Sequence, residues 1–328
     1  MDVLHYLAKK GAVIEREMVR AIPPRRRPWE VYGLIWDFLK RGGKRFRPEL
    51  CLLSCEAVGG KRSQAMPAAV AIELFHNFSL IHDDIEDDSA MRRGKPCLHR
   101  IYGVPLAINA GDGLFVMVLK ALQRLPEDKA LHARAMLENA FIAVLEGQGM
   151  ELNWYRNNRW DVGERDYLRM VAGKTGSLIS ASCEVGAFLG GGRPAEVRAL
   201  KEFGMEIGIA FQIQDDVLNL IGTEAKYKKE IGGDITEGKR SIIVTKAMEV
   251  LPKEEKARLV ALLSSGTRDR KSINEAIELL RGCGAIDYAS AKSLALVRRA
   301  ERRLAVLRPS PARERLKQIA DFFVKREF

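Results

Sequence analysis

The chain has 328 residues, of which 47% are hydrophobic and 30% are charged, and its formal net charge is +11. These values are typical of a globular protein with one large domain or two ordinary ones. No uninterrupted run of residues reaches the roughly 18 apolar positions that a membrane span requires. Residues 1–18 mix charged and apolar side chains, so we expect no signal peptide and a cytoplasmic location.

The cysteines and the positive charge narrow the cellular compartments and the kinds of binding partner that fit this sequence. The five cysteines are odd in number and scattered, which argues against a disulfide framework and fits a reducing compartment. A positive excess suits nucleic acid, an anionic membrane or anionic substrates. The early basic triplet, residues 25–27, lies between prolines without interleaved aromatic residues, so we expect no nucleic-acid surface.

Apolar residues recur every three or four positions along almost the whole chain, which predicts an all-α fold. No stretch resembles a long linker, so we expect one helical bundle over residues 1–328. Segments 66–81 and 204–221 are apolar on nearly all sides, which predicts two buried helices with a central cavity between their acidic ends. The predicted helices are 2–20, 29–40, 45–58, 66–90, 105–123, 127–149, 165–171, 175–190, 194–221, 240–250, 253–264, 271–282, 285–307 and 311–326.

Residues 75–94 carry the densest chemistry, because an apolar run leads into five acids within six positions and then two arginines. On a helix, Asp83 and Asp87 share a face at i, i+4, and Asp84 and Asp88 repeat that relation beside them. Like charges at this spacing repel by roughly 0.2–0.5 kcal/mol per pair. Mg²⁺ would compensate, and it usually takes one or two carboxylates together with substrate phosphates. Arg92 and Arg93 are of the residue type that grips such phosphates. A solvated acidic helix end is the competing interpretation.

Two short glycine-rich segments precede basic residues. Residues 42–48 read Gly-Gly-Lys-Arg-Phe-Arg-Pro and open a predicted helix. Residues 173–176 read Gly-Lys-Thr-Gly, but no strand precedes them and the spacing of a phosphate-binding loop is absent. Lys174 and Thr175 are still predicted to hold a phosphate at a helix N-terminus.

A second acidic site lies at residues 211–219, Phe-Gln-Ile-Gln-Asp-Asp-Val-Leu-Asn. Buried carboxylates need a cation or a metal, and Gln212, Asp215 and Asn219 form a polar stripe on an apolar helix. The following residues, 228–240, suit a loop that folds over an anion, with a solvated charged turn as the alternative.

Together these motifs resemble the trans-isoprenyl diphosphate synthases, the polyprenyl synthetase family, and most closely the archaeal type that forms geranylgeranyl diphosphate. The likeness covers residues 42–239 with the motifs in the family's order. It implies the isoprenoid synthase fold, Mg²⁺, about three ions per site by family expectation, and a homodimer. It also implies that isopentenyl diphosphate is condensed with an allylic diphosphate. The family often has Asp where this chain has Asn219, which loses a charge.

The resemblance also assigns roles to individual residues. Metal ligands are Asp83, Asp84, Asp87 and Asp215, with Asp84 in support. Isopentenyl diphosphate is held by Lys44, Arg47, His76 and Arg93. The allylic diphosphate is held by Arg92, Lys174, Thr175, Gln212, Lys229 and Lys239, and among these Lys174, Lys229 and Arg92 act in catalysis.

Product length is expected to depend on Phe78 and Ser79, five and four positions before Asp83. By resemblance, one aromatic at the fifth position indicates a C20 product, with farnesyl or longer products as alternatives. An ideal helical wheel instead places Phe78 opposite the acid face, so a plain core phenylalanine is a second interpretation.

Three other functions remain as alternatives. A terpene cyclase would share the first acidic motif, but it would lack the Lys44 and Arg47 site. A non-enzymatic helical protein would bind a metal or nucleic acid. An inactive partner subunit of a prenyl synthase should have lost acids or basic residues that this chain retains.

Overall fold

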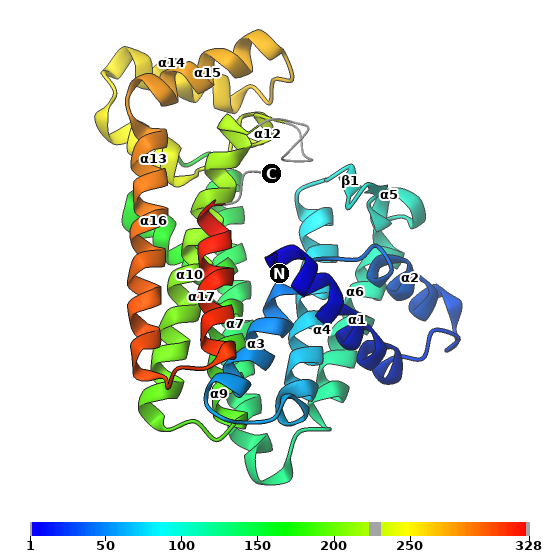
Figure 1. Ribbon diagram of the computed structural model, residues 1–328. Helices are drawn as coiled ribbons and strands as arrows, with labels where there is room; N and C mark the ends of the chain where they lie inside the picture. Colours follow the sequence, from blue (N-terminus) through cyan, green and yellow to red (C-terminus); the bar gives the residue numbers. More distant parts are fainter. Residues whose placement is uncertain (1, 223–230, 326–328) are drawn as a thin grey trace. The chain divides into compact units, whose positions relative to one another are not determined.

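The computed structural model describes residues 2–222 and 231–325, and helices make up nearly all of them (Figure 1). The predicted all-α fold is thereby confirmed. The helices are α1 (Val3–Ala21), α2 (Trp29–Leu39), α3 (Phe46–Ala57), α4 (Arg62–Glu86), α5 (Leu98–Tyr102), α6 (Val104–Leu122), α7 (Glu127–Arg156), α8 (Glu164–Val171), a π-helix (Ala172–Gly176), α9 (Ser177–Leu189), α10 (Pro194–Ile221), α12 (Gly233–Thr236), α13 (Ile242–Val250), α14 (Lys253–Ser264), α15 (Arg270–Gly282), α16 (Ala285–Arg303), a 3₁₀ turn (Leu304–Val306) and α17 (Pro311–Lys325). Strands β1 (Met91–Arg92) and β2 (Lys95–Pro96) form a short antiparallel hairpin.

Contacts divide the chain into two compact units. The first consists of Met1–Phe141, Ala181–Lys201 and Val306–Leu316, and the second of Ile142–Ser180, Glu202–Ala305 and Lys317–Phe328. Helices α7, α9, α10 and α17 contribute residues to both.

In the first unit, α4 packs against α3 and α6, and its middle is buried as the sequence predicted. Gly186 allows α9 to lie close to α3: a Cβ at this position would lie 2.0 Å from the backbone oxygen of Cys51. This close packing fixes α3, at whose N-terminus the basic turn of residues 42–47 lies.

In the second unit, glycines allow backbones to touch around the π-helix. A Cβ at Gly147 of α7 would lie 2.3 Å from the backbone nitrogen of Lys174, and one at Gly208 of α10 would lie 2.8 Å from the Cα of Gly176. The segment 172–176 is therefore held between two helices by main-chain contact. Glycine is the residue that permits such approach, at a cost in helix propensity of about 0.5–1 kcal/mol.

The structure corrects several predicted boundaries. Helix α4 runs from Arg62 to Glu86 instead of 66–90, because Lys61 and Gln64 form a capping box and Asp88 adopts a positive φ of 50°. Asp84 and Asp88 therefore do not repeat the helical relation predicted for them. Helix α7 continues to Arg156 instead of 149, since Gly147 serves close packing and does not end the helix. Helices α5 and α12 and the hairpin are too short to show a period in the sequence.

Among the described residues, one helix, α6, is long and apolar enough to cross a membrane, and 39% of its apolar window is buried. Length and composition do not separate such a span from a core helix. In this structure α6 packs against α2 and α4. Five of its large apolar residues are exposed, namely Val104, Leu106, Ile108, Val116 and Leu119. Four of them recur four, eight and three positions apart and are called the apolar stripe of α6: Val104, Ile108, Val116 and Leu119.

Candidate functional site

The acidic C-terminus of α4 presents carboxylates in three environments. Asp83 is half-buried, Asp84 is buried and Asp87 is exposed. The backbone N–H of Asp87 donates to the Asp83 carbonyl at 2.9 Å, so the i, i+4 relation predicted for these two acids holds. The Oδ2 atom of Asp84 is buried without a hydrogen-bond partner among the described residues.

The β1–β2 hairpin brings Arg92 onto these acids. Arg92 donates from Nε to Asp84 Oδ1 at 2.6 Å and from Nη2 to Asp83 Oδ2 at 3.1 Å. Arg93 and Gly94 both have positive φ, 54° and 75°, as a two-residue type I′ hairpin turn requires. Burial raises the pKa of Asp84 although Arg92 opposes the shift. Burial thus disfavours the charged form of Asp84, and the positive charge of Arg92 stabilises that form.

A second cluster in the same unit is almost entirely cationic. The turn before α3, the middle of α4 and the hairpin line one cavity of about 50 Å³. Four of the described lining residues are positively charged and one is a carboxylate, Glu73. The lining residues are Gly43, Lys44, Arg45, Phe46, Arg47, Glu73, His76 and Arg93. All four residues predicted to hold isopentenyl diphosphate are thus brought together.

His76 is neutral in this cavity. Burial lowers the pKa of the imidazole well below its usual value, and Arg47 and Arg93 lower it further. Its Nε2 atom lies 3.4 Å from Arg47 Nη1. A guanidinium only donates, so Nε2 must be the acceptor and Nδ1 carries the proton. Burial also lowers the pKa of both Arg47 and Arg93 to about 10.

The second unit gathers a hydrogen-bonded cluster around Asp216 of α10. Tyr167 donates from its hydroxyl to Asp216 Oδ2 at 2.7 Å, and Lys239 donates to Oδ1 at 2.8 Å. Gln212 also donates to Oδ1, at 3.1 Å, and accepts from the Thr175 hydroxyl at 3.0 Å. Three residues predicted for the allylic diphosphate, Thr175, Gln212 and Lys239, are therefore linked through a carboxylate to which no role was assigned.

Lys174 and Thr175 do not lie at a free helix N-terminus, which corrects the prediction made for them. They lie in the π-helix, which continues directly from α8 into α9. Lys174 donates to Glu151 of α7 at 2.5 Å. Such π segments within α-helices are frequent at functional sites, and here the distortion accompanies the glycine contacts with α7 and α10.

Asn219 and Asp215 lie on the same helix as Asp216. The side-chain oxygen of Asn219 accepts the backbone N–H of Asp234 at 2.9 Å, and its carbonyl accepts that of Gly232 at 2.8 Å. Asn219 therefore anchors the segment that leads to Lys239. Burial raises the pKa of Asp234 to about 7, opposed by Lys239. Asp215 is half-buried.

Phe78 belongs to an aromatic cluster in the first unit. Its ring centroid lies 5.4 Å from that of Phe75 and 5.3 Å from that of Phe115 on α6. Ser79 is half-buried and donates to the carbonyl of His76. Lys229 lies outside the described residues.

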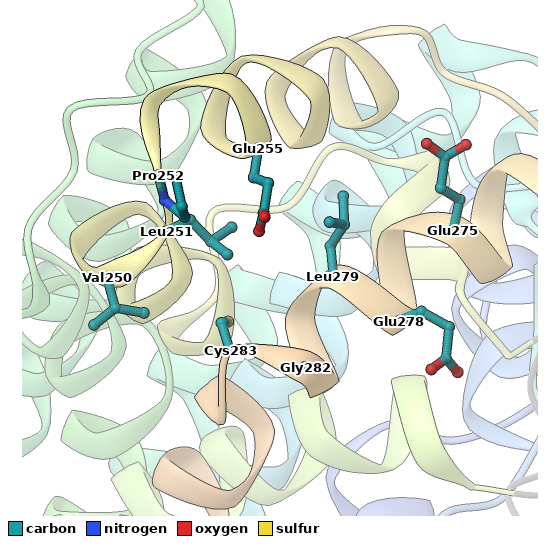
Figure 2. Close-up of a pocket in the computed structure, with 9 residues that line it drawn as sticks. All are labelled: Val250, Leu251, Pro252, Glu255, Glu275, Glu278, Leu279, Gly282 and Cys283. Carbon is teal, nitrogen blue, oxygen red and sulfur yellow. The ribbon is translucent and has the colours of Figure 1, made fainter.

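A cavity of about 540 Å³ lies elsewhere in the second unit, between α13, α14 and α15 (Figure 2). Figure 2 shows Leu251, Pro252 and Leu279 around it, with Glu255, Glu275 and Glu278 on its acidic side. None of the described site residues lines this cavity, and no cationic side chain lines it. It therefore does not suit an anionic ligand.

The acids fit a divalent metal that is shared with a phosphate. Across residues 2–222 and 231–325, no three His, Cys, Asp or Glu side chains gather closely enough to hold an ion by themselves. Mg²⁺ commonly takes only one or two protein carboxylates and completes its shell with water and substrate phosphate. The hard carboxylate oxygens of Asp83 and Asp87 are suited to that arrangement.

Comparison with known proteins found a matching family model and related chains of similar length. The family model "Polyprenyl synthetase" matches residues 30–280. A short chain isoprenyl diphosphate synthase of Methanothermobacter thermautotrophicus is 45% identical over all of this chain and 98% of its own length. A geranylgeranyl pyrophosphate synthase of Geoglobus acetivorans is 36% identical, with 98% of each chain covered. A geranylfarnesyl diphosphate synthase of Natronomonas pharaonis is 34% identical, over 98% of this chain and 97% of that one.

Solved structures of similar proteins have the same fold as this chain. The crystal structure of geranylgeranyl pyrophosphate synthetase from Pyrococcus horikoshii superimposes with a TM-score of 0.94 at 38% identity, covering 99% of this chain and 98% of the other. A polyprenyl synthase from Caulobacter crescentus, complexed with calcium and isoprenyl diphosphate, has a TM-score of 0.89 at 27% identity and covers 99% and 97%. The fold predicted from the motifs is thereby confirmed as the isoprenoid synthase fold.

The buried neutral imidazole leads to a prediction about stability and pH. The unfolded chain protonates His76 below about pH 6.5, whereas the folded chain holds it neutral. The unfolded state then binds more protons, so stability decreases as pH falls through that value, by at most about 1.4 kcal/mol per pH unit. We expect His76→Asn to unfold with a shallower dependence on pH between 7 and 5, measured by denaturant titration. The exposed His132→Asn serves as the control, and an equal slope for His76→Asn and wild type would contradict the prediction.

Proposed function

The chain belongs to the polyprenyl synthetase family and is an isoprenyl diphosphate synthase, and we propose that it makes geranylgeranyl diphosphate. Isopentenyl diphosphate would add head-to-tail, in the trans sense, to an allylic diphosphate. The observation that supports this most strongly is the cationic cavity of the first unit, where four positive side chains meet one carboxylate. A terpene cyclase has no use for this second anion site, so condensation is favoured.

The cavity would bind isopentenyl diphosphate without a metal, because its own cations balance the diphosphate charge. Lys44, Arg47 and Arg93 supply the positive charge, and His76 stays neutral beside them. Arginine suits this task because its planar fork of donors matches phosphate oxygens. Arg47 Nη1 already lies 3.4 Å from His76 Nε2, so one side of the proposed phosphate site is formed before the ligand binds.

The acids would hold Mg²⁺, about three ions per site by family expectation. We assign Asp83 and Asp87 as ligands, Asp84 as a support that also holds Arg92, and Asp215 as a ligand in the second unit. Bound Mg²⁺ would stabilise the negative charge that develops on the leaving diphosphate.

The basic side chains would share that task. Arg92, Lys174 and Lys229 would stabilise the same developing charge, while Thr175, Gln212 and Lys239 would orient the allylic diphosphate. The allylic C–O bond would break to release diphosphate, and the double bond of isopentenyl diphosphate would attack the allylic cation. The released diphosphate would then take the proton that the product loses. An apolar surrounding would keep water from the cation.

A C20 product is supported by Phe78, whose ring packs with Phe75 and Phe115 and would bound the growing chain. Farnesyl and longer products remain the alternatives, since relatives named for both geranylgeranyl and geranylfarnesyl products have similar identity.

We further propose a cytoplasmic homodimer of a single-domain enzyme. The family model spans residues of both units, which supports one functional domain. All five cysteines are free, as a reducing compartment allows. The apolar stripe of α6 defined above would be covered by a second copy.

Asp83→Ala should lower the rate of condensation at least about a hundredfold, because a group that stabilises leaving-group charge is removed. The rate is measured with labelled isopentenyl diphosphate and each of the C5, C10 and C15 primers. Asp128→Ala, an exposed acid on α7, is the matched control. Unchanged turnover of Asp83→Ala would reject the proposed function.

Phe78→Ala should shift the products to longer chains, because a half-buried ring is removed from the cluster with Phe115. Products are dephosphorylated and sized by chromatography. Phe188→Ala, which removes another half-buried ring in the same unit, should leave the distribution as in wild type. An unchanged distribution for Phe78→Ala would remove this residue as the limit.

Val116→Glu should convert the dimer to monomers, because the exposed valine lies within the proposed interface on α6. Molar mass is measured by light scattering at several concentrations. A monomeric wild-type protein would contradict the proposed dimer and leave the catalytic assignments as they are.

A further inference from the structure

A chain of buried hydrogen bonds leads from Arg45 to Arg93 through the middle of α4. Arg45 donates to Glu73 Oε1 at 2.5 Å, and the Asn77 amide donates to the same oxygen at 2.9 Å. Arg93 then donates to Asn77 Oδ1 at 3.2 Å. Glu73 and Asn77 are 2% and 0% exposed, so both are removed from water.

The orientation of the Asn77 amide is determined by its partners. Its nitrogen donates both to the Glu73 carboxylate and to the Glu73 carbonyl, the latter at 2.7 Å. The oxygen must then point toward Arg93, which has only donors to offer. If the amide were reversed, its nitrogen would face the N–H donor of Arg93, and its oxygen would face the two acceptor oxygens of Glu73.

The two arginines need such support because of their backbones. Arg45 and Arg93 have φ of 53° and 54°, a left-handed region that is unfavourable for a residue with a Cβ atom. Arg45 also donates to the carbonyl of Leu39 at 3.3 Å. Of the described residues that line the cavity, Glu73 alone carries negative charge, and Arg45 has a second carboxylate partner in Glu15, whose Oε1 lies 3.3 Å from Arg45 Nη2.

We infer that Asn77 and Glu73 are positioning residues of the isopentenyl diphosphate site, with Asn77 fixing Arg93 and Glu73 orienting Asn77 and Arg45. The inference rests on the proposed function, because it takes Arg93 as a ligand of that diphosphate. Asn77 does not line the cavity, and Glu73 lines it with a carboxylate oxygen that already accepts from Arg45 and Asn77. Their effect is to hold a guanidinium in place before the anion arrives, which lowers the entropic cost of binding.

The test is the effect of Asn77→Ala on the two substrates separately. The KM for isopentenyl diphosphate should rise about tenfold or more, as expected for loss of a hydrogen bond to a charged group. The KM for the allylic diphosphate and the kcat should stay near wild type. Titration calorimetry with isopentenyl diphosphate alone, without metal, should show the same weakening. Ile72→Ala, buried on the same helix, should lower the Tm without changing either KM.

A double-mutant cycle separates positioning from a general packing effect. Once Arg93→Ala has been made, adding Asn77→Ala should raise the KM for isopentenyl diphosphate no further. Additive effects, equal rises in both KM values, or an unchanged KM would each overturn the inference. If Asn77→Ala does not fold, Asn77→Leu of similar volume takes its place, and failure of both to fold assigns Asn77 to the fold instead. Wild-type protein that does not condense the substrates would refute the proposed function, a different result.

Discussion

Closely spaced positive charge is the constraint on which the basic cavity of the first unit depends: Arg45 is buried, Arg47 and Arg93 are half-buried, and Lys44 is exposed. Lys44, Arg45, Arg47 and Arg93 line one cavity with Glu73 as the single carboxylate among the described lining residues. Charges of one sign held close together in a region of low dielectric repel strongly, and arginines that lose water without gaining partners are unstable. The lowered pKa values of Arg47 and Arg93 report that strain. The proposed diphosphate would bring negative charge beside these arginines and would offset this cost.

In the second unit, the buried carboxylate of Asp216 has its partners within the protein. Asp216 already accepts hydrogen bonds from Tyr167, Gln212 and Lys239, so its carboxylate is satisfied before any ligand binds. A fully satisfied buried network is rigid, and each member restricts its neighbours. The amide oxygen of Asn219 extends this order to the backbone of Asp234. Asn219 lacks the charge of an aspartate at this position, but its amide oxygen still accepts the backbone N–H of Asp234.

The sequence predicted those features that depend on local spacing. The helical relation of Asp83 and Asp87, the helix that opens after the basic turn and the buried acids of α10 were all readable from periodicity. What it did not predict were partners brought together by tertiary packing. The pairing of Asp84 with Arg92 depends on a hairpin of four strand residues, and the role of Asp216 depends on a tyrosine 49 positions away. Glu73 did carry a signal, since it is a charged residue within an apolar helix, but nothing in the sequence named Arg45 and Asn77 as its partners.

The glycine contacts around residues 172–176 affect how this protein can change over evolutionary time. Where main chain rests on main chain, no side chain can be exchanged for a larger or smaller one to adjust the distance. Mutation can therefore alter what the Lys174 and Thr175 side chains offer a ligand more readily than it can move the backbone that carries them. Substrate preference in this part of the enzyme should drift through side-chain chemistry and not through movement of its supports.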